Sequence, residues 1–79
     1  MLIQVKLFAT LRRYAGDTSP GQPIPVELPA GATLQDLVEL LGIPLQETKI
    51  AYVNAKAQEL DWVLQPGDEV GIFPPIGGG

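Results

Sequence analysis

The first apolar residues of the chain alternate with polar ones. Ile3, Val5 and Leu7 are separated from one another by single polar residues, and a period of two is typical of a strand with one buried face. The next residues, Ala9–Tyr14, can form a short helix that ends at Gly16, because glycine readily adopts the backbone conformation that terminates helices. The pattern therefore predicts a strand and a short helix at the start of the chain.

A second alternating segment lies near the other end of the chain. Val70 and Ile72 fall on one face of the predicted strand Glu69–Phe73, and Phe73 falls on the other face. The three residues before this strand, Pro66-Gly67-Asp68, have the composition of a tight turn. The pattern predicts a turn followed directly by the last strand of the sheet.

Two phenylalanines follow the outward phase of these two strands. If the alternation holds, Phe8 and Phe73 share the sheet face opposite the core and are exposed to solvent. A patch of two phenylalanines on so small a protein is a candidate interface. The alternative is that short strands and loops cover both rings, which gives them a packing role instead.

The clearest helix begins after Thr33. Thr33 is a favourable N-cap, and Asp36, three residues later, completes an aspartate version of the capping box. One apolar face follows from residues at helical spacing. These residues are Leu34, Leu37, Val38 and Leu41. Gly42 suits the position directly after the helix, and Pro44 prevents its continuation.

The remaining segments complete a small mixed fold. Residues 17–25 are rich in proline, glycine and serine and predict a loop, and residues 25–28 suit a short strand whose prolines fit a sheet edge. Residues 49–54 predict a third strand, and residues 60–64 predict a minor strand or a 3₁₀ turn. This order predicts a single α+β domain over residues 1–79, with one main helix packed on one face of the sheet.

Composition limits the chemistry that this chain of 79 residues can perform by itself. It contains no cysteine and no histidine, which removes thiolate chemistry, the commonest general base and the commonest metal ligand. We therefore expect no metal site and no bound cofactor. A net charge of −4 and a single basic pair, Arg12-Arg13, argue against nucleic-acid binding. No apolar run of about 18 residues and no signal-peptide pattern occurs, so we expect a cytoplasmic protein without a membrane segment.

The acidic and aromatic residues give no catalytic constellation. Asp36 and Glu39 lie on the polar side of the predicted helix and are expected to be solvated, and Asp68 and Glu69 are assigned to the turn before the last strand. No third element supports a site of paired carboxylates. Tyr52 is expected to act in packing or in an interface.

The end of the chain offers one reactive group. The last residues are Pro74-Pro75-Ile76-Gly77-Gly78-Gly79. Glycine has no Cβ, so the carboxylate of Gly79 can enter a narrow slot in another protein, while Pro74 and Pro75 stiffen the approach. We expect residues 74–79 to form an extended, flexible tail. The alternative is a frayed terminus or a cloning remnant without function.

Both ends of the chain resemble the small subunit of molybdopterin synthase. Residues 64–79 contain, in order, Gly-Asp-Glu-Val, an apolar strand, Pro-Pro and a closing Gly-Gly, as that family does. Residues 5–12, Val-Lys-Leu-Phe-Ala-Thr-Leu-Arg, are similar to its first strand, Phe-Ala pair and short helix. The resemblance implies a ubiquitin-like β-grasp fold with a mixed sheet of four to five strands. It also implies that Phe8 and Phe73 lie at the subunit interface.

The resemblance implies that the protein carries sulfur. In that family an adenylating enzyme, similar to ubiquitin-activating enzymes, uses ATP to activate the terminal glycine carboxylate, and sulfur from a donor protein replaces AMP to give a thiocarboxylate. The large synthase subunit uses this sulfur to build the dithiolene of molybdopterin, so the small subunit needs no catalytic group of its own. The terminal pair corresponds to Gly78 and Gly79, with Gly79 as the reacting residue. Gly77 departs from the family, which often has another residue there, and leaves the end group unchanged.

Three other functions stay open on the sequence. A sulfur carrier of the thiamine pathway has the same broad fold, although the loop over residues 17–25 and the opening Leu-Phe-Ala favour the molybdopterin family. A ubiquitin-like protein modifier uses the same tail chemistry up to the adenylate and then joins its terminal glycine to a lysine of a target. A plain interaction domain with an inert tail is the last alternative.

Overall fold

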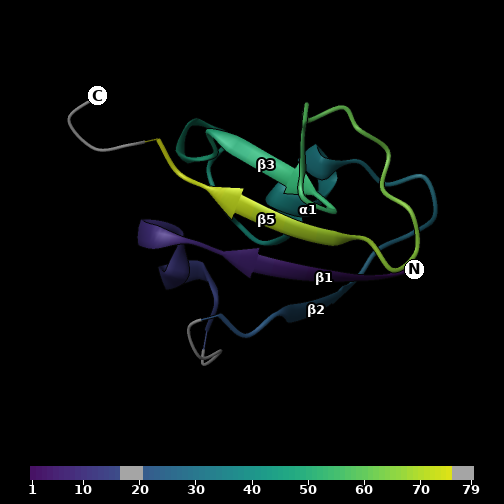
Figure 1. The fold of residues 1–79 in the computed structure, drawn as a ribbon, viewed down its shortest axis with the longest axis horizontal. Coiled ribbons are helices and arrows are strands. Elements are labelled where there is room, and N and C mark those ends of the chain that lie inside the picture. Colours follow the sequence, from purple (N-terminus) through teal and green to yellow (C-terminus); the bar gives the residue numbers. More distant parts are fainter. Residues whose placement is uncertain (17–20, 76–79) are drawn as a thin grey trace.

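The computed structural model describes residues 1–16 and 21–75, which form a five-stranded mixed sheet in the order β2-β1-β5-β3-β4 (Figure 1). The elements, in chain order, are β1 (Leu2–Leu7), the 3₁₀ helix η1 (Ala9–Tyr14), β2 (Ile24–Glu27), α1 (Leu34–Leu40), the 3₁₀ turn η2 (Leu45–Glu47), β3 (Ile50–Val53), β4 (Lys56–Gln58) and β5 (Glu69–Phe73). The central strand β5 runs parallel to β1 and antiparallel to β3. The mixed α+β architecture with one main helix, predicted from the pattern, is confirmed.

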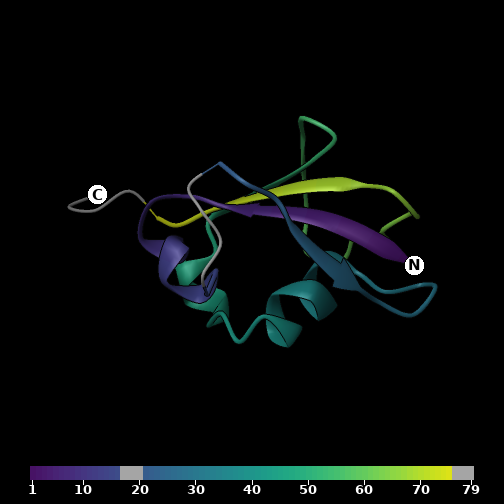
Figure 2. The ribbon, with the colours of Figure 1, turned by 90° about the horizontal axis from the view of Figure 1, so that it is seen from below.

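The helical elements all lie on one side of the sheet, as the edge-on view makes clear (Figure 2). Ile3 and Val5 of β1 and Ile72 of β5 point to that side and are completely buried. They form one core with the apolar face of α1, in which Leu34 and Leu37 are also completely buried. The predicted inward phase of the two strands is therefore confirmed, and the opposite face of the sheet stays free of helices.

The capping box predicted at the start of α1 is present. The backbone amide of Thr33 donates to Oδ2 of Asp36 at 2.9 Å, and the amide of Asp36 donates to Oγ1 of Thr33 at 3.2 Å. Asp36 is thus a cap and not only a solvated charge. The helix ends as predicted, since Gly42 follows the C-cap residue Leu41 with a φ of +77°, a conformation that costs glycine little.

Of the strand and the 3₁₀ turn predicted as alternatives for residues 60–64, the structure has a turn, in which the amide of Trp62 donates to the carbonyl of Glu59 at 3.0 Å. Leu60 lies in a turn, and Val63 makes only an isolated bridge to Thr33. The outermost strand is instead β4, which forms a hairpin with β3. Its turn residues, Asn54 and Ala55, both have positive φ, at +50° and +73°. That combination usually has glycine in the second position, so the dipeptide Asn-Ala is only a weak hairpin signal.

Two smaller differences concern the edge strand and η2. The strand expected at residues 25–28 is β2, Ile24–Glu27, and it lies at the sheet edge, where its proline does not interrupt an inner ladder. The turn η2 was not predicted, because three residues are too few for a helical apolar pattern to be detected. The described residues share one hydrophobic core, while the expectation of one domain over residues 1–79 stays a prediction.

Candidate functional site

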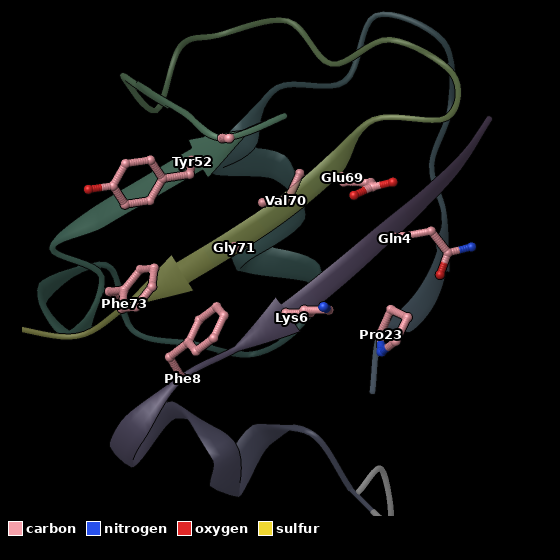
Figure 3. Close-up of a pocket in the computed structure, with 10 residues that line it drawn as sticks. Gln4, Lys6, Phe8, Pro23, Tyr52, Glu69, Val70, Gly71 and Phe73 are labelled. Carbon is pink, nitrogen blue, oxygen red and sulfur yellow. The ribbon is translucent and has the colours of Figure 1, made fainter. Parts of the chain in front are cut away.

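The helix-free face of the sheet carries a hollow of about 660 Å³ along the central strand β5 (Figure 3). Its floor is Gly71, and its sides come from outward-pointing residues of the neighbouring strands β1 and β3. The lining residues used below are Gln4, Lys6, Phe8, Tyr52, Glu69 and Phe73. A hollow with an aromatic end and a charged end suits the binding of another protein surface.

Three aromatic rings lie at the end of the hollow where β5 finishes, and we call Phe8, Tyr52 and Phe73 the aromatic patch. The rings of Phe8 and Phe73 stack with centroids 4.2 Å apart and an interplanar angle of 1°. Tyr52 meets Phe73 edge-on, with centroids 5.6 Å apart and an angle of 84°. The structure thus brings together the two phenylalanines that the sequence placed on one face and adds Tyr52 to them.

The expectation that both phenylalanines are exposed to solvent is met only in part. Phe8 and Phe73 are half-buried, because each stacked ring covers one face of the other and Phe8 also covers the backbone of Gly71. Among the described residues no helix lies on this side of the sheet (Figure 2), and both rings line the open hollow. The interface role of the two residues stays a prediction.

The backbone around Phe8 explains how its ring reaches β5. The amide of Phe8 donates to the carbonyl of Ile72 at 3.2 Å, so the parallel pairing of β1 with β5 extends through this residue. Ala9 then takes a φ of +53°, which alanine adopts only at an energetic cost. That conformation ends the strand and starts η1, and it leaves the Phe8 side chain over the sheet.

The carboxyl-terminal tail leaves the sheet beside the aromatic patch. The amide of Lys49 donates to the carbonyl of Phe73 at 2.9 Å, and the next two residues, Pro74 and Pro75, have no amide hydrogen with which to continue the ladder. Both prolines line a second hollow of about 650 Å³, which shares Tyr52 and Phe73 with the first hollow. The predicted reactive glycines, residues 77–79, lie outside the described residues.

A buried aspartate fixes the start of β5 to the end of β3. Asp68 accepts hydrogen bonds from Nδ2 of Asn54 at 3.0 Å and from the amide of Gln65 at 2.8 Å. Asn54 in turn accepts from the amide of Glu69 at 3.0 Å. The predicted turn is confirmed, but Asp68 is only 8% exposed and its carboxylate supports the fold. The sequence placed Asn54 and Asp68 in two separate turns. Only the tertiary structure shows that these two turns meet and that the two side chains form a hydrogen bond.

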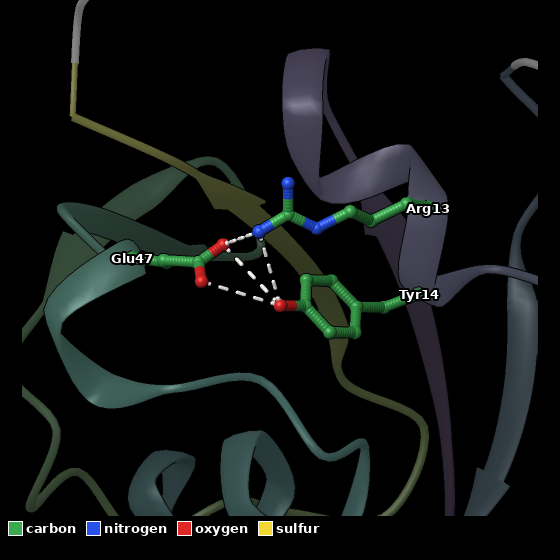
Figure 4. A network of polar contacts seen from close by, with 3 residues as sticks. All are labelled: Arg13, Tyr14 and Glu47. Atoms are coloured by element: carbon green, nitrogen blue, oxygen red, sulfur yellow. Dashed lines mark hydrogen bonds and ion pairs between the residues drawn. The ribbon is translucent and has the colours of Figure 1, made fainter.

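A polar network joins η1 to η2 on the helical side of the sheet (Figure 4). Arg13 donates to the carboxylate of Glu47 and, at 3.2 Å, to the hydroxyl of Tyr14. The Tyr14 hydroxyl donates to Glu47 across 3.3 Å. The hydrogen bond to Tyr14 and the charge of Glu47 raise the pKa of the Arg13 guanidinium. The network ties η1 to η2, whose first two residues line the second hollow together with Pro74 and Pro75.

The described part of the chain shows neither a cluster of metal ligands nor a membrane-spanning helix. Within residues 1–16 and 21–75, no group of three potential metal ligands occurs together. In the same ranges no helix has the length and apolar character needed to cross a membrane. Within the aromatic patch only Tyr52 has an ionisable group, so the patch contains no pair of acid and base.

Comparison with known proteins identifies a family that the chain matches over almost its whole length. Residues 5–79 match the model of the ThiS family. A proposed molybdopterin converting factor subunit 1 from Pyrococcus furiosus is 30% identical, with 96% of this chain and 99% of that chain covered and a TM-score of 0.72. Small archaeal modifier protein 1, SAMP1, from Haloferax volcanii is 26% identical over 100% of both chains, with a TM-score of 0.73.

A third structure supports the fold alone. The complex of subunits 1 and 2 of the molybdopterin-converting factor from Helicobacter pylori contains a chain that is 19% identical, with 100% of both chains covered and a TM-score of 0.57. Together these neighbours confirm the ubiquitin-like β-grasp fold that the sequence resemblance implied.

Proposed function

The chain belongs to the ThiS family of ubiquitin-like sulfur carriers, and on that premise we propose that it is the sulfur-carrying small subunit of a molybdopterin synthase. The single observation that carries the proposal is the place of the tail: Pro74 and Pro75 leave β5 directly beside the Phe8–Phe73 stack. A partner that docks on the aromatic patch therefore lies where it can receive the residues that follow.

The proposed chemistry uses the terminal carboxylate. An oxygen of the Gly79 carboxylate attacks the α-phosphate of ATP on an adenylating enzyme, so that pyrophosphate leaves and an acyl adenylate forms. A sulfur nucleophile from a donor protein then attacks the carbonyl carbon, and AMP leaves. When the nucleophile is a persulfide, this attack gives an acyl disulfide; a thiol of the donor protein then attacks the S–S bond, so that Gly79 ends in a thiocarboxylate and the donor ends in a disulfide. The catalytic groups belong to the partners, which fits a chain without cysteine or histidine.

The proposed acceptor partner is the large subunit of the synthase. The similarity to the proposed subunit 1 from Pyrococcus furiosus supports this choice. In the Helicobacter pylori structure a chain of the same fold is found in a complex with subunit 2. We propose that the aromatic patch docks on the large subunit and that Gly77, Gly78 and Gly79 enter its active site, since glycines fit a narrow channel.

A protein-modifier role is the second candidate. The observation that favours it is the similarity to SAMP1 over the full length of both chains, a protein named as a small archaeal modifier. A modifier shares the adenylation step and then forms an amide between Gly79 and a lysine of a target. A thiamine-pathway carrier shares the thiocarboxylate and differs in the enzyme that accepts the sulfur.

Intact-mass spectrometry tests the carrier chemistry. The full chain is incubated with a candidate adenylating enzyme, ATP and a sulfur donor, and we expect the mass to rise by the difference between one sulfur and one oxygen atom. A matched chain extended by one alanine after Gly79 should not react, because misplacement of a reacting atom by about 1 Å can reduce a rate by about a hundredfold. An unchanged mass with an adenylating enzyme that activates its own carrier would contradict the proposal.

A second measurement separates the candidate functions. The thiocarboxylated chain is mixed with the large synthase subunit and the pterin precursor, and dithiolene formation is followed as loss of sulfur from the chain. We expect transfer with the large subunit and none with a thiazole-forming synthase. Transfer only to the thiazole synthase, or amide-linked conjugates in place of a sulfur product, would favour the corresponding alternative.

A further inference from the structure

Lys6 is the cation of the helix-free sheet face. It lies on β1 in the outward phase, is exposed, and is the register partner of Gly71 at the floor of the hollow. In Figure 3 it lies between Phe8 and Gln4 along the same strand. Among the described residues that line the hollow, Lys6 carries the positive charge and Glu69 the negative one. The two charges occupy the half of the hollow away from Phe73.

Lys6 forms no ion pair within the described part of the chain. The ion pairs found there join the Met1 amino group to Glu27 and Arg13 to Glu47. Glu69 lies on the same face, but it is the register partner of Gln4, whereas Lys6 faces Gly71. Glu69 is thus a diagonal neighbour of Lys6, one step away from direct cross-strand pairing. Within residues 1–16 and 21–75, the exposed Lys6 ammonium therefore has no carboxylate partner.

Docking on the aromatic patch changes that environment. Phe8 is two residues from Lys6 and lies on the same side of the sheet. Gly71 is the register partner of Lys6, and the Phe8 ring packs against the backbone of Gly71. A partner surface that covers the Phe8–Phe73 stack and fills the hollow also removes water from Lys6. An ammonium that loses water without gaining a partner is strongly disfavoured, and this cost would cancel much of what burial of the aromatic rings contributes.

We propose that the surface that docks on the aromatic patch carries a carboxylate that pairs with Lys6, and that this pair fixes the orientation of the partner and helps to select it. The inference rests on the proposed docking of a synthase subunit. With Lys6 and Glu69 as diagonal neighbours, the face shows a positive and a negative charge at defined places beside an apolar end. A partner with the complementary order can bind in one register, and a rotated partner meets like charges.

The local charge differs from that of the whole chain. The net charge of −4 favours encounter with a basic partner. Lys6, in contrast, requires a negatively charged group of the partner at one point inside the interface. The partner predicted by this combination has an apolar centre, a carboxylate facing Lys6 and basic groups elsewhere on its surface. General electrostatic attraction then speeds association, while the Lys6 contact supplies specificity.

The test measures binding of the full chain to the large synthase subunit from the same organism by calorimetry, at low and high salt. The variants are Lys6→Glu, Lys6→Met and, as a matched control, Lys56→Glu. Lys56 is also exposed, but it pairs with Val53 and so lies on the other side of the sheet. We expect Lys6→Glu to raise the dissociation constant at least about tenfold and Lys56→Glu to change it by less than about twofold. Lys6→Met, which loses the charge and keeps an apolar side chain, should weaken binding less than Lys6→Glu does.

Each outcome separates the inference from the function on which it rests. If Phe73→Ala weakens binding and Lys6→Glu does not, the aromatic patch is still the docking surface, but the proposed ion pair between Lys6 and a carboxylate of the partner is wrong. If Lys6→Glu and Lys56→Glu change the dissociation constant by the same factor and in the same direction, only the net charge matters, which also overturns the inference. If the unmodified chain does not bind the large subunit, the proposed function and the inference fail together. Thermal unfolding of each variant shows whether the fold is unchanged.

Discussion

The ring of Phe8 lies directly on the backbone of Gly71. A Cβ placed on Gly71 would stand 3.2 Å from Cε2 of Phe8, closer than ordinary van der Waals contact between carbon atoms. The missing side chain at the centre of β5 therefore lets the Phe8 ring lie flat and stack on Phe73. This close approach, and not a positive φ, is the reason for glycine at this position.

We expect Gly71→Val to displace the Phe8 ring. Overpacking of this kind destabilises a protein by about 1–3 kcal/mol, and chemical denaturation measures the loss. In a Phe8→Ala background the same substitution should cost much less, because the clash is gone and valine favours strands. A coupling between the two positions of at least about 0.5 kcal/mol is expected for residues in contact. Equal costs in both backgrounds would show that Phe8 does not rest on Gly71.

Truncation of Phe73 should affect both folding and binding. We expect Phe73→Ala to lose the stacked and edge-on ring contacts, each worth about 0.5–1.5 kcal/mol to the monomer, and to weaken binding of the large subunit by about 1–4 kcal/mol if it is a central anchor. Denaturation and calorimetry provide the two values.

Its neighbour Ile72 is the matched control for Phe73, because it is completely buried and points to the core. Ile72→Ala should cost about 2–5 kcal/mol of folding free energy, without removing any contact from the docking face. If Phe73→Ala destabilises the monomer as much as Ile72→Ala does, Phe73 acts as a core residue and the docking role is wrong.

Asp68 should be the acidic residue whose loss harms folding most clearly. Asp68→Ala leaves the amide of Gln65 and Nδ2 of Asn54 without their acceptor, and an unsatisfied buried group costs about 1–3 kcal/mol. The exposed residue Asp61 is a control of the same type, and Asp61→Ala should change stability by less than about 0.5 kcal/mol. Comparable losses for the two variants in denaturant titrations would argue against a specific role for the Asp68 contacts.

The hairpin between β3 and β4 offers a stabilising change. Ala55 has a φ of +73°, a left-handed conformation that costs a non-glycine residue about 1–2 kcal/mol. Ala55→Gly should remove this strain and raise stability by up to about 1 kcal/mol, since added freedom in the unfolded chain offsets part of the gain. Ala57→Gly, in the adjacent strand β4, should instead lower stability by about 0.5–1 kcal/mol. A shift in melting temperature of the same sign for both variants would contradict the turn geometry.

The sequence alone determined the elements that depend on local chemistry. Thr33 and Asp36 define the start of α1 because an N-cap and its capping box need only residues three apart. The alternation through Ile3, Val5 and Leu7 defined the buried face of β1, because the side-chain period of a strand is fixed. The motifs at both ends of the chain, with Gly79 as the last residue, indicated a sulfur carrier through their resemblance to a known family, and they left a protein modifier or an inert tail as alternatives.

Tertiary structure decided what depends on residues far apart in the chain. The stack of Phe8 on Phe73 exists because β1 and β5 pair in parallel, and the alternation could set the faces of the strands but not the distance between the rings. The burial of Asp68 follows from the meeting of its turn with Asn54, and the position of Lys6 beside Gly71 follows from the register of the central strands. Pairing and register are long-range properties set by packing of the whole core, so the sequence supplied the aromatic and charged residues and the fold assembled them into one surface beside the tail.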